Sequence, residues 1–308
     1  MILCCGEALI DMIPEATNLG QEGFVPHCGG AVFNTAIALG RLGVRTGMLT
    51  GLSNDMFGRQ LTDALAASHV DTRLVINSDR PTTLAFVKLV GGHASYTFYD
   101  ENSAGRMLAD SDMPPLGDDV SALYFGGISL ACEPGAEAYL ALAKRHARER
   151  AVIVDPNIRA GFIADEARYR ARLEALIAHT DVLKVSDEDL NWILGTPLSL
   201  AQKAEALLQK GPALVIVTRG GEGATGYLRG GVAVDVPAQR VQIADTVGAG
   251  DTFNAGVMAK LSEKGLLSKE KLAALGPDEL REALSFGAKV AAVTVSRAGA
   301  NPPWADEL

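Results

Sequence analysis

The 308-residue sequence lacks several features that would each indicate a particular class of protein. Its four cysteines include no C-x-x-C pair, which favours free thiols in a reducing compartment over a disulfide framework. The five histidines are scattered, with none four residues from another, which argues against a histidine metal site. There is no G-x-x-x-x-G-K-[ST] P-loop, no G-x-S-x-G elbow and no G-x-G-x-x-G after the first apolar run. An NAD-binding oxidoreductase would therefore be supported only by a general α/β pattern.

Charge and hydropathy exclude further classes of partner. The chain carries 28 basic and 37 acidic residues, a net charge of −9 at pH 7, and no Lys/Arg-rich run. This balance argues against nucleic acid as a partner. No stretch approaches the ~18 apolar residues of a membrane span, and the N-terminus lacks the basic region and apolar core of a signal peptide. We therefore expect a cytoplasmic protein that binds neither membrane nor nucleic acid.

What the sequence does contain is an alternation of apolar strand-like runs and helical patterns. The first strand is predicted over residues 2–10 and ends at Asp11. Further strands are predicted over residues 44–50, 122–125, 151–154, 182–185 and 214–218. Helices are predicted over residues 31–42, 57–67, 135–150, 166–179, 188–194, 200–209, 253–263 and 277–290, with a short strand over 292–296. Such an alternation is typical of an α/β protein with a mostly parallel sheet covered by helices.

Two stretches interrupt this alternation. Residues 12–27 read as irregular, because they contain two prolines and two glycines. Residues 82–90 and 94–99 are rich in β-formers around Gly91-Gly92, which predicts a hairpin. A second hairpin is predicted over 223–228 and 232–236. With no repeat and no linker, we expect one domain, residues 1–308, with lid segments inserted at about 12–27 and 82–106. The alternative is an edge hairpin without a role.

The stretch from Asp245 to Phe253 carries the strongest chemical signal. Gly248, Ala249 and Gly250 stand directly before Asp251, and an apolar helical run follows. Small residues at a helix start let backbone N–H groups surround an anion. A carboxylate in the same turn fits a general base. The alternative is that the acid only caps the helix and the glycines only make a turn.

Polar residues and glycines also follow several of the predicted strands. Because parallel strands end at one edge of a sheet, we expect these residues to share that edge, where ligands bind in open α/β sheets. Each residue alone is more typical of a cap or a turn. They are Asp11, Asn157, Arg159, Ser186, Glu188, Asp189, Thr218, Gly220 and Gly223.

Two motifs together resemble those of the PfkB-type, or ribokinase-like, carbohydrate kinases. They are Gly29-Gly-Ala-Val-Phe-Asn-Thr-Ala36 and Asp245-Thr-Val-Gly-Ala-Gly-Asp-Thr-Phe253, and the order of elements fits from end to end. The resemblance implies a three-layer α/β/α fold with a small β-sheet lid. It also implies that the γ-phosphoryl of ATP, bound with Mg²⁺, is transferred to a sugar hydroxyl.

The resemblance assigns roles to matching positions. Asp251 is expected to be the base, and the N–H groups of Gly248, Ala249 and Gly250 the anion hole. The residues expected to bind the sugar are Asp11, Gly29, Gly30, Asn34, Phe98, Asn157 and Arg159. Those expected to bind the nucleotide are Lys184, Ser186, Thr218, Gly220 and Gly223.

The metal positions follow the family pattern less closely. Members often carry Asn-x-x-Glu after the strand that corresponds to residues 182–185, with the Glu serving Mg²⁺ through water. The same spacing here gives Ser186-Asp-Glu-Asp189, so either Asp189 or Glu188 is expected to serve Mg²⁺. The resemblance also points to a monovalent-cation site, K⁺ in relatives, near Asp245, Val247, Arg297 and Gly299. Dimerisation through the β lid is common among relatives and is expected here.

The acceptor is indicated by the runs over residues 81–86 and 96–108, which are most similar to bacterial fructokinases. We therefore expect fructose, ahead of 2-keto-3-deoxygluconate, ribose and a nucleoside. A catalytically weak sugar- or nucleotide-binding protein on the same fold is the alternative from another class.

Overall fold

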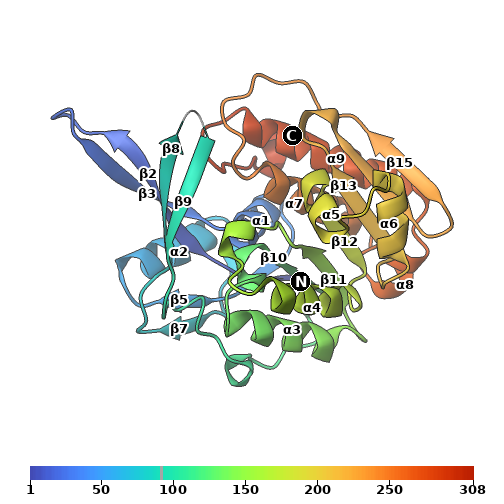
Figure 1. The fold of residues 1–308 in the computed structure, drawn as a ribbon, viewed down its shortest axis with the longest axis horizontal. Helices are drawn as coiled ribbons and strands as arrows, with labels where there is room; N and C mark the ends of the chain where they lie inside the picture. The colour runs from blue at the N-terminus through green and yellow to red at the C-terminus, as the bar shows by residue number, and fades with distance from the viewer. Residues whose placement is uncertain (91–92) are drawn as a thin grey trace.

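The computed structural model describes residues 1–90 and 93–308 of the chain and has a large sheet between two layers of helices, as Figure 1 shows. Within these residues nine strands form the large sheet, in the order β15-β14-β13-β12-β11-β10-β1-β4-β6. The strands are β1 (Ile2–Cys5), β4 (Thr46–Leu49), β6 (Val70–Asp71), β10 (Ala122–Gly126), β11 (Ala151–Asp155), β12 (Val182–Ser186), β13 (Leu214–Thr218), β14 (Ala224–Leu228) and β15 (Val232–Val236). All neighbours are parallel except β13-β14 and β14-β15.

Both faces of the large sheet are buried, because side chains alternate between two apolar clusters. Ile2 and Cys4 of β1 belong to one cluster, and Leu3 and Cys5 belong to the other. The first cluster includes residues of α1 (Ala31–Arg41), α2 (Met56–Ala67), α7 (Ala249–Glu263), α8 (Lys269–Ala273) and α9 (Pro277–Val295). The second includes residues of α3 (Gly135–His146), α4 (Glu166–Ile177), α5 (Asp187–Ile193) and α6 (Leu200–Leu208). The predicted three-layer α/β/α arrangement is confirmed.

The first apolar run is divided between two sheets, so the single strand predicted over residues 2–10 is wrong. After β1 the chain bends at residues 6–8 and re-enters β structure as β2 (Leu9–Ala16), which belongs to a second sheet. Glu7 lies at the bend and is buried, with its carboxylate accepting the backbone N–H groups of Ala31 and Ser129. These partners are remote in sequence, so the apolar pattern alone could not reveal the bend.

The second sheet, called the small sheet below, has the order β3-β2-β8-β9 and projects from the body in Figure 1. It includes β3 (Glu22–Gly29), β8 (Leu84–Val90) and β9 (His93–Tyr99). The prediction that residues 12–27 are irregular is wrong, because β2 and β3 pair there as an antiparallel hairpin. Its prolines are tolerated because β3 is an edge strand and Pro14 lies beyond the residues of β2 that pair with β8. The predicted pairing of β8 with β9 is confirmed, and its Gly91-Gly92 turn lies outside the described residues.

The C-terminal helix is longer than the sequence pattern predicts. The strand expected over residues 292–296 is wrong, since α9 continues to Val295. β-Branched residues in this stretch favour a strand, but the helix packs along α7 and tertiary packing overrides that preference. The sequence pattern also did not predict α8, β6, or the two-stranded sheet formed by β5 (Gly51–Ser53) and β7 (Ile76–Ser78). No helix in the described part of the chain combines the length and hydropathy needed to span a membrane.

Candidate active site

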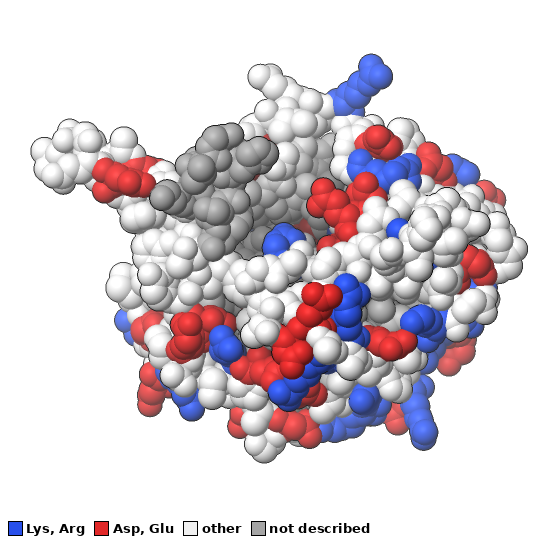
Figure 2. All heavy atoms as spheres, in the orientation of Figure 1, with Lys and Arg blue, Asp and Glu red and all other residues white. Residues whose placement is uncertain are grey.

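A cavity of about 340 Å³ lies between the small sheet and the start of α7, at the carboxyl end of the large sheet. Figure 2 shows the molecule hollowed between the small sheet and the body, with a basic side chain in the hollow. The structure brings many of the predicted site residues to this cavity. They are Asp11, Gly30, Asn34, Phe98, Asn157, Arg159, Lys184, Val247, Gly248, Ala249, Gly250 and Asp251.

Asp251 faces the cavity and is not a helix cap. The N-cap of α7 is Gly248, and no side chain caps this helix start. The Asp251 carboxylate instead accepts a 2.9 Å hydrogen bond from Nδ2 of Asn34, on α1. Its backbone carbonyl accepts a 3.2 Å bond from the hydroxyl of Thr35. The capping alternative is therefore wrong, and the carboxylate is held across the α1–α7 contact.

The protonation of Asp251 is shifted towards neutral pH. Burial raises the pKa of its carboxyl to about 7, and the hydrogen bond from Asn34 opposes this shift. The nearby Asp155 carboxylate adds to the increase in the pKa. A carboxylate with a pKa near 7 is a far stronger proton acceptor than an exposed aspartate.

The first turn of α7 presents backbone N–H groups to the same cavity. Gly248 has a φ of 76°, and a Cβ there would lie 2.7 Å from the Cβ of Ala300, so only glycine fits. The first N–H groups of a helix have no acceptor within the helix. That of Ala249 donates to the carbonyl oxygen of Thr246, at 3.3 Å. This helix start carries partial positive charge and suits an anion.

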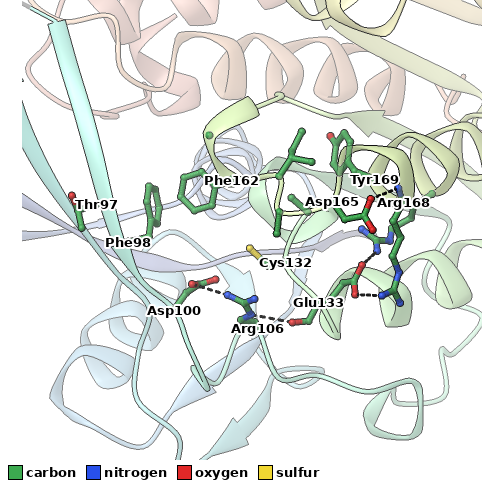
Figure 3. Close-up of a pocket in the computed structure, with 15 residues that line it drawn as sticks. Thr97, Phe98, Asp100, Arg106, Cys132, Glu133, Phe162, Asp165, Arg168 and Tyr169 are labelled. Carbon is green, nitrogen blue, oxygen red and sulfur yellow. Dashed lines mark hydrogen bonds and ion pairs between the residues drawn. The ribbon is translucent and has the colours of Figure 1, made fainter.

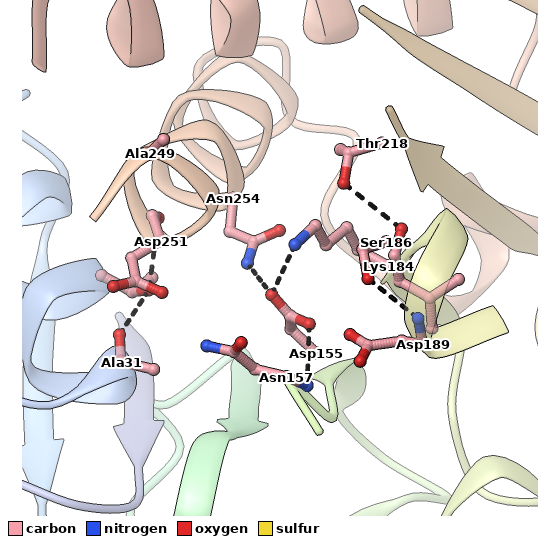
Figure 4. Close-up of polar contacts among 12 residues, drawn as sticks. Ala31, Asp155, Asn157, Lys184, Ser186, Asp189, Thr218, Ala249, Asp251 and Asn254 are labelled. Atoms are coloured by element: carbon pink, nitrogen blue, oxygen red, sulfur yellow. Dashed lines mark hydrogen bonds and ion pairs between the residues drawn. The ribbon is translucent and has the colours of Figure 1, made fainter. Parts of the chain in front are cut away.

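A buried network of polar side chains lies next to the start of α7 (Figure 4). The Lys184 ammonium and Nδ2 of Asn254 both donate to Oδ2 of Asp155, at 2.8 and 2.7 Å. Nδ2 of Asn254 also donates to the hydroxyl of Tyr124, at 3.2 Å. A Cβ at Gly250 would lie 3.2 Å from the Lys184 ammonium, so the cation lies beside the first turn of α7. Sequence reasoning missed Asp155 and Asn254, although a charged residue ending an apolar strand was a usable signal for Asp155.

The opposite wall of the cavity carries Asp11, at the end of the small sheet nearest the body. Burial raises the pKa of its carboxyl to about 6. Gly29 does not line the cavity, but a Cβ there would lie 2.1 Å from Oδ2 of Asp11, so glycine makes room for this carboxylate. Arg159 lies across the cavity, and its guanidinium donates to the carbonyl oxygens of Asn157 and Ile158, at 3.4 and 3.2 Å. Carboxylate, amide and guanidinium groups thus converge on one space.

Two further residues of the cavity were not predicted. Glu7 takes the place of a missing cap for α1, because its carboxylate accepts the N–H of Ala31 at 3.0 Å and the N-cap, Gly30, has no side chain. Burial raises the pKa of the Glu7 carboxyl. Phe162 contacts Phe98 from the opposite side, with ring centroids 3.9 Å apart. Neither residue carries a sequence signal, since each acts through neighbours far along the chain.

The predicted nucleotide residues other than Lys184 lie outside this cavity but along the same sheet edge. Ser186 and Thr218 are neighbours in the register of β12 and β13. Ser186 also caps α5, its hydroxyl accepting the N–H of Asp189 at 2.9 Å. Gly220 and Gly223 form the turn after β13, each with positive φ. The edge therefore continues from the cavity towards β14.

The two candidate Mg²⁺ residues differ in surroundings. Asp189 is buried, and its carboxylate accepts the N–H of Ile158 at 3.2 Å. Burial, reinforced by the charge of Asp155, raises the pKa of the Asp189 carboxyl. Glu188 is exposed. Among the described residues there is no cluster of three or more His, Cys, Asp or Glu that could hold a metal by itself.

The predicted cation residues near the C-terminus come together only in part. The Asp245 carboxylate accepts the N–H of Val247 at 3.0 Å and that of Gly299 at 2.9 Å, and so joins the loop before α7 to the loop after α9. The Arg297 guanidinium is instead paired with Glu307, at 2.8 Å.

Solved structures with the same fold define the class of protein. The fructokinase of Xylella fastidiosa with bound ATP matches with a TM-score of 0.88 and 29% identity, over 97% of this chain and 93% of that one. A fructokinase double mutant of Vibrio cholerae O395, in a form with fructose, ADP and potassium ion bound, matches with a TM-score of 0.83 and 26% identity, over 97% and 93%. The fold is that of the ribokinase-like sugar kinases.

The sequence comparisons identify the family within that class. The pfkB family of carbohydrate kinases matches over residues 1–307. A fructokinase of Rhizobium leguminosarum bv. trifolii is 51% identical over 281 residues, which cover 91% of this chain and 86% of the relative. The chain belongs to the pfkB family of carbohydrate kinases, and its enzyme class is that of a carbohydrate phosphotransferase.

Proposed function

We propose that this enzyme phosphorylates fructose with ATP as the phosphoryl donor. The observation that carries the proposal is the 51% identity to a fructokinase over most of both chains. The cavity offers Asp11, Asn34 and Arg159 to a hydroxylated acceptor, next to a helix start suited to a phosphoryl group.

Asp251 is proposed as the general base. As the acceptor oxygen attacks the γ-phosphorus, its proton passes to the Asp251 carboxylate, the bond from the γ-phosphorus to the β,γ-bridging oxygen breaks, and ADP leaves. Asn34 orients the carboxylate by donating to one of its oxygens. Burial in this site supports the role, because a pKa of about 7 leaves the carboxyl able to accept a proton near neutral pH.

The backbone at Gly248–Gly250 is proposed as the anion hole for the transferring phosphoryl. Fixed N–H donors and helix polarity stabilise charge without reorganising during the reaction. The Lys184 ammonium, held by Asp155 beside this turn, adds positive charge on the nucleotide side. Ser186, Thr218, Gly220 and Gly223 are proposed to continue the nucleotide site along the sheet edge.

Mg²⁺ is proposed to bind with ATP, near Asp189 rather than Glu188. Mg²⁺ neutralises phosphate charge and needs only one or two protein carboxylates, often through water. The buried Asp189 carboxylate and the absence of a larger carboxylate cluster in the described residues fit such a site. Asp189→Asn should raise the Mg²⁺ concentration for half-maximal activity, and Glu188→Gln should leave it unchanged. The reverse result would assign the ion to Glu188.

A monovalent cation, K⁺, is proposed to bind at the loop held by Asp245. A potassium ion accompanies the Vibrio cholerae structure, and the Asp245 carboxylate here joins the two loops with oxygens that retain lone pairs. Arg297 is excluded from this proposal, because it pairs with Glu307. Replacing K⁺ by tetramethylammonium should lower turnover, and Asp245→Asn should abolish the difference between the two ions.

The small sheet is proposed as the lid over the acceptor and as a dimer interface. Phe24, Val25 and Tyr99 on this sheet are 43%, 36% and 59% exposed, which is unusual for apolar side chains gathered on one element. Light scattering of wild type and Phe24→Ser tests the dimer, which the substitution should weaken.

A cytoplasmic location is proposed because the enzyme needs ATP as its phosphoryl donor.

A second acceptor, 2-keto-3-deoxygluconate, is favoured by one observation. Arg159 lines the cavity, and within the described residues its guanidinium donates to the backbone carbonyl oxygens of Asn157 and Ile158. An acidic sugar could pair with it. Ribose is the third candidate.

A coupled assay of ATP consumption tests the acceptor directly. Fructose, 2-keto-3-deoxygluconate, ribose and adenosine are compared at equal concentrations with the same enzyme. Fructose should give the highest kcat/KM. A higher value for the acidic sugar, together with its loss in Arg159→Ala, would replace fructose by 2-keto-3-deoxygluconate. No turnover with any sugar would overturn the proposed function.

A further inference from the structure

A second cavity of about 500 Å³ adjoins the active-site cavity, and two phenylalanines form the boundary between them. Phe98 and Phe162 line both cavities. Their rings meet edge to face, with centroids 3.9 Å apart and planes at 86°. Figure 3 shows this pair on one side of the second cavity, with Asp100 and Arg106 below Phe98 and with Glu133, Asp165 and Arg168 on the other side. The aromatic pair therefore lies between the two spaces.

The Phe98 side of the pair is anchored to the body of the protein. Phe98 lies in β9, Asp100 directly follows the last residue of that strand, Tyr99, and both Phe98 and Asp100 line the second cavity. Asp100 is buried and accepts a 2.9 Å bond from the Arg106 guanidinium. The same guanidinium donates to the carbonyl oxygen of Glu133, at 3.0 Å. The base of the small sheet is thus held in place close to Phe98.

The Phe162 side comes from the short turn between β11 and α4. Its backbone N–H donates to the carbonyl oxygen of Arg159, at 2.8 Å, so the ring follows directly from a residue of the active-site cavity. Asp165, three residues further on, caps α4 by accepting the N–H of Arg168. The segment around Phe162 is therefore hydrogen bonded to Arg159 on one side and joined to α4 through Asp165 on the other. The Phe162 ring contacts Phe98 from the side opposite the small sheet.

The walls of the second cavity carry balanced charge. Its lining includes three basic and three acidic side chains, and these are Arg106, Arg168, Arg172, Asp100, Glu133 and Asp165. The Arg168 guanidinium pairs with Glu133 at 2.7 Å, and Arg172 contacts the same carboxylate. A net charge near zero favours neither an anion nor a cation. Paired charges with spare lone pairs and N–H groups suit an uncharged group rich in hydroxyls, such as a sugar ring.

The geometry points to Phe162, together with Phe98, as the determinant that limits the acceptor to a single sugar ring. With the pair closed, a monosaccharide occupies the active-site cavity and a second ring has no route into the neighbouring space. Removing the Phe162 ring joins the two cavities, and the second ring of a disaccharide then enters a compartment whose chemistry suits it. This inference rests on the proposed function.

The test compares fructose with sucrose, in which a glucose ring is attached to fructose while the primary hydroxyls of the fructose remain free. Wild type should phosphorylate fructose and leave sucrose unreacted. Phe162→Ala should increase the ratio of kcat/KM for sucrose to that for fructose by about tenfold or more. Phe162→Leu, which keeps most of the bulk, should give a much smaller increase. Mass spectrometry of the product shows whether intact sucrose carries the phosphoryl group.

Two further variants keep the test decisive. Phe98→Ala opens the same boundary from the other side and should change the ratio in the same direction. Phe86→Ala removes a ring of similar size that packs on Phe24 and Tyr99 within the small sheet, and it should leave the ratio unchanged. The inference is overturned if wild type already accepts sucrose, or if both boundary variants turn over fructose without gaining sucrose. A wild type that prefers another monosaccharide overturns the choice of fructose, and the same variants then test the boundary with that sugar and its glycoside.

Discussion

The two walls of the active-site cavity are built in different ways. On the α7 side, Asp251, Lys184 and Asp155 are buried, and each is hydrogen bonded to a partner from another element. On the side of the small sheet, apolar side chains such as Tyr99 remain exposed, and Asp100, directly after β9, is paired with Arg106 at the base of the sheet. The difference separates two tasks. In the proposed function, phosphoryl transfer depends on groups that buried hydrogen bonds hold in place, and selection of the acceptor depends on the small sheet.

The largest expected effect concerns the buried wall. Asp251→Asn keeps the size of the side chain and an oxygen for Asn34 to bond, but it cannot accept the acceptor's proton. Turnover should fall by about 10²–10⁴-fold, with ATP affinity nearly unchanged. Asp278→Asn is the matched control, because Asp278 also lies in the first turn of a helix but is exposed. Steady-state kinetics and nucleotide titration measure both quantities. An unchanged turnover in Asp251→Asn would contradict its role as base.

The next effect concerns the stability of the same wall. Lys184→Met leaves the Asp155 carboxylate buried without its cation, and the free energy of unfolding should fall by about 3–5 kcal/mol. The double variant with Asp155→Asn should lose less than the sum of the single losses, because the uncompensated charge is gone. Chemical denaturation measures all three. Additive losses would mean that the ion pair does not couple the two residues, and the contrast between the walls would weaken.

A smaller effect concerns the pH dependence of activity. In the proposed mechanism Asp251 must be ionised to act as the base, so kcat/KM should rise with pH through a pKa of about 7. The Asn34 hydrogen bond favours the ionised form, so Asn34→Ala should raise that pKa by about half a unit to one unit and move the acid limb to higher pH. Thr35→Val is the control, since the Thr35 hydroxyl bonds the backbone of Asp251 and not its carboxylate. An acid limb that stays in place in Asn34→Ala would show that this bond does not tune the base.

The smallest effect is expected at the base of the small sheet. Arg106→Ala removes the link between Asp100 and the carbonyl oxygen of Glu133, so the KM for the sugar should rise about three- to tenfold while kcat changes little. Arg45→Ala, which removes an exposed ion pair with Asp119, should change neither value. A loss of kcat equal to the rise in KM would mean that the small sheet takes part in the chemical step, and the two walls would not be separate in function.

Local sequence signals predicted the buried wall better than the small sheet. The strands of the large sheet are apolar runs, and the glycines before Asp251 mark the helix start, so both follow from neighbouring residues. The small sheet was missed in part because Pro14 and Pro26 suggested irregular structure, although an edge position tolerates them. Glu7, Asp155, Asn254 and Phe162 were missed for another reason. Their partners lie elsewhere in the chain, and no local pattern records those contacts.

The bend at Glu7 is the covalent connection between the two walls. One side of this short joint is β1, at the centre of the large sheet, and the other is β2, in the small sheet. The Glu7 carboxylate accepts the N–H of Ala31 at the start of α1, one helical turn before Asn34, whose amide donates to the Asp251 carboxylate. One short segment therefore joins the small sheet to the helix start that positions Asn34 against the Asp251 carboxylate.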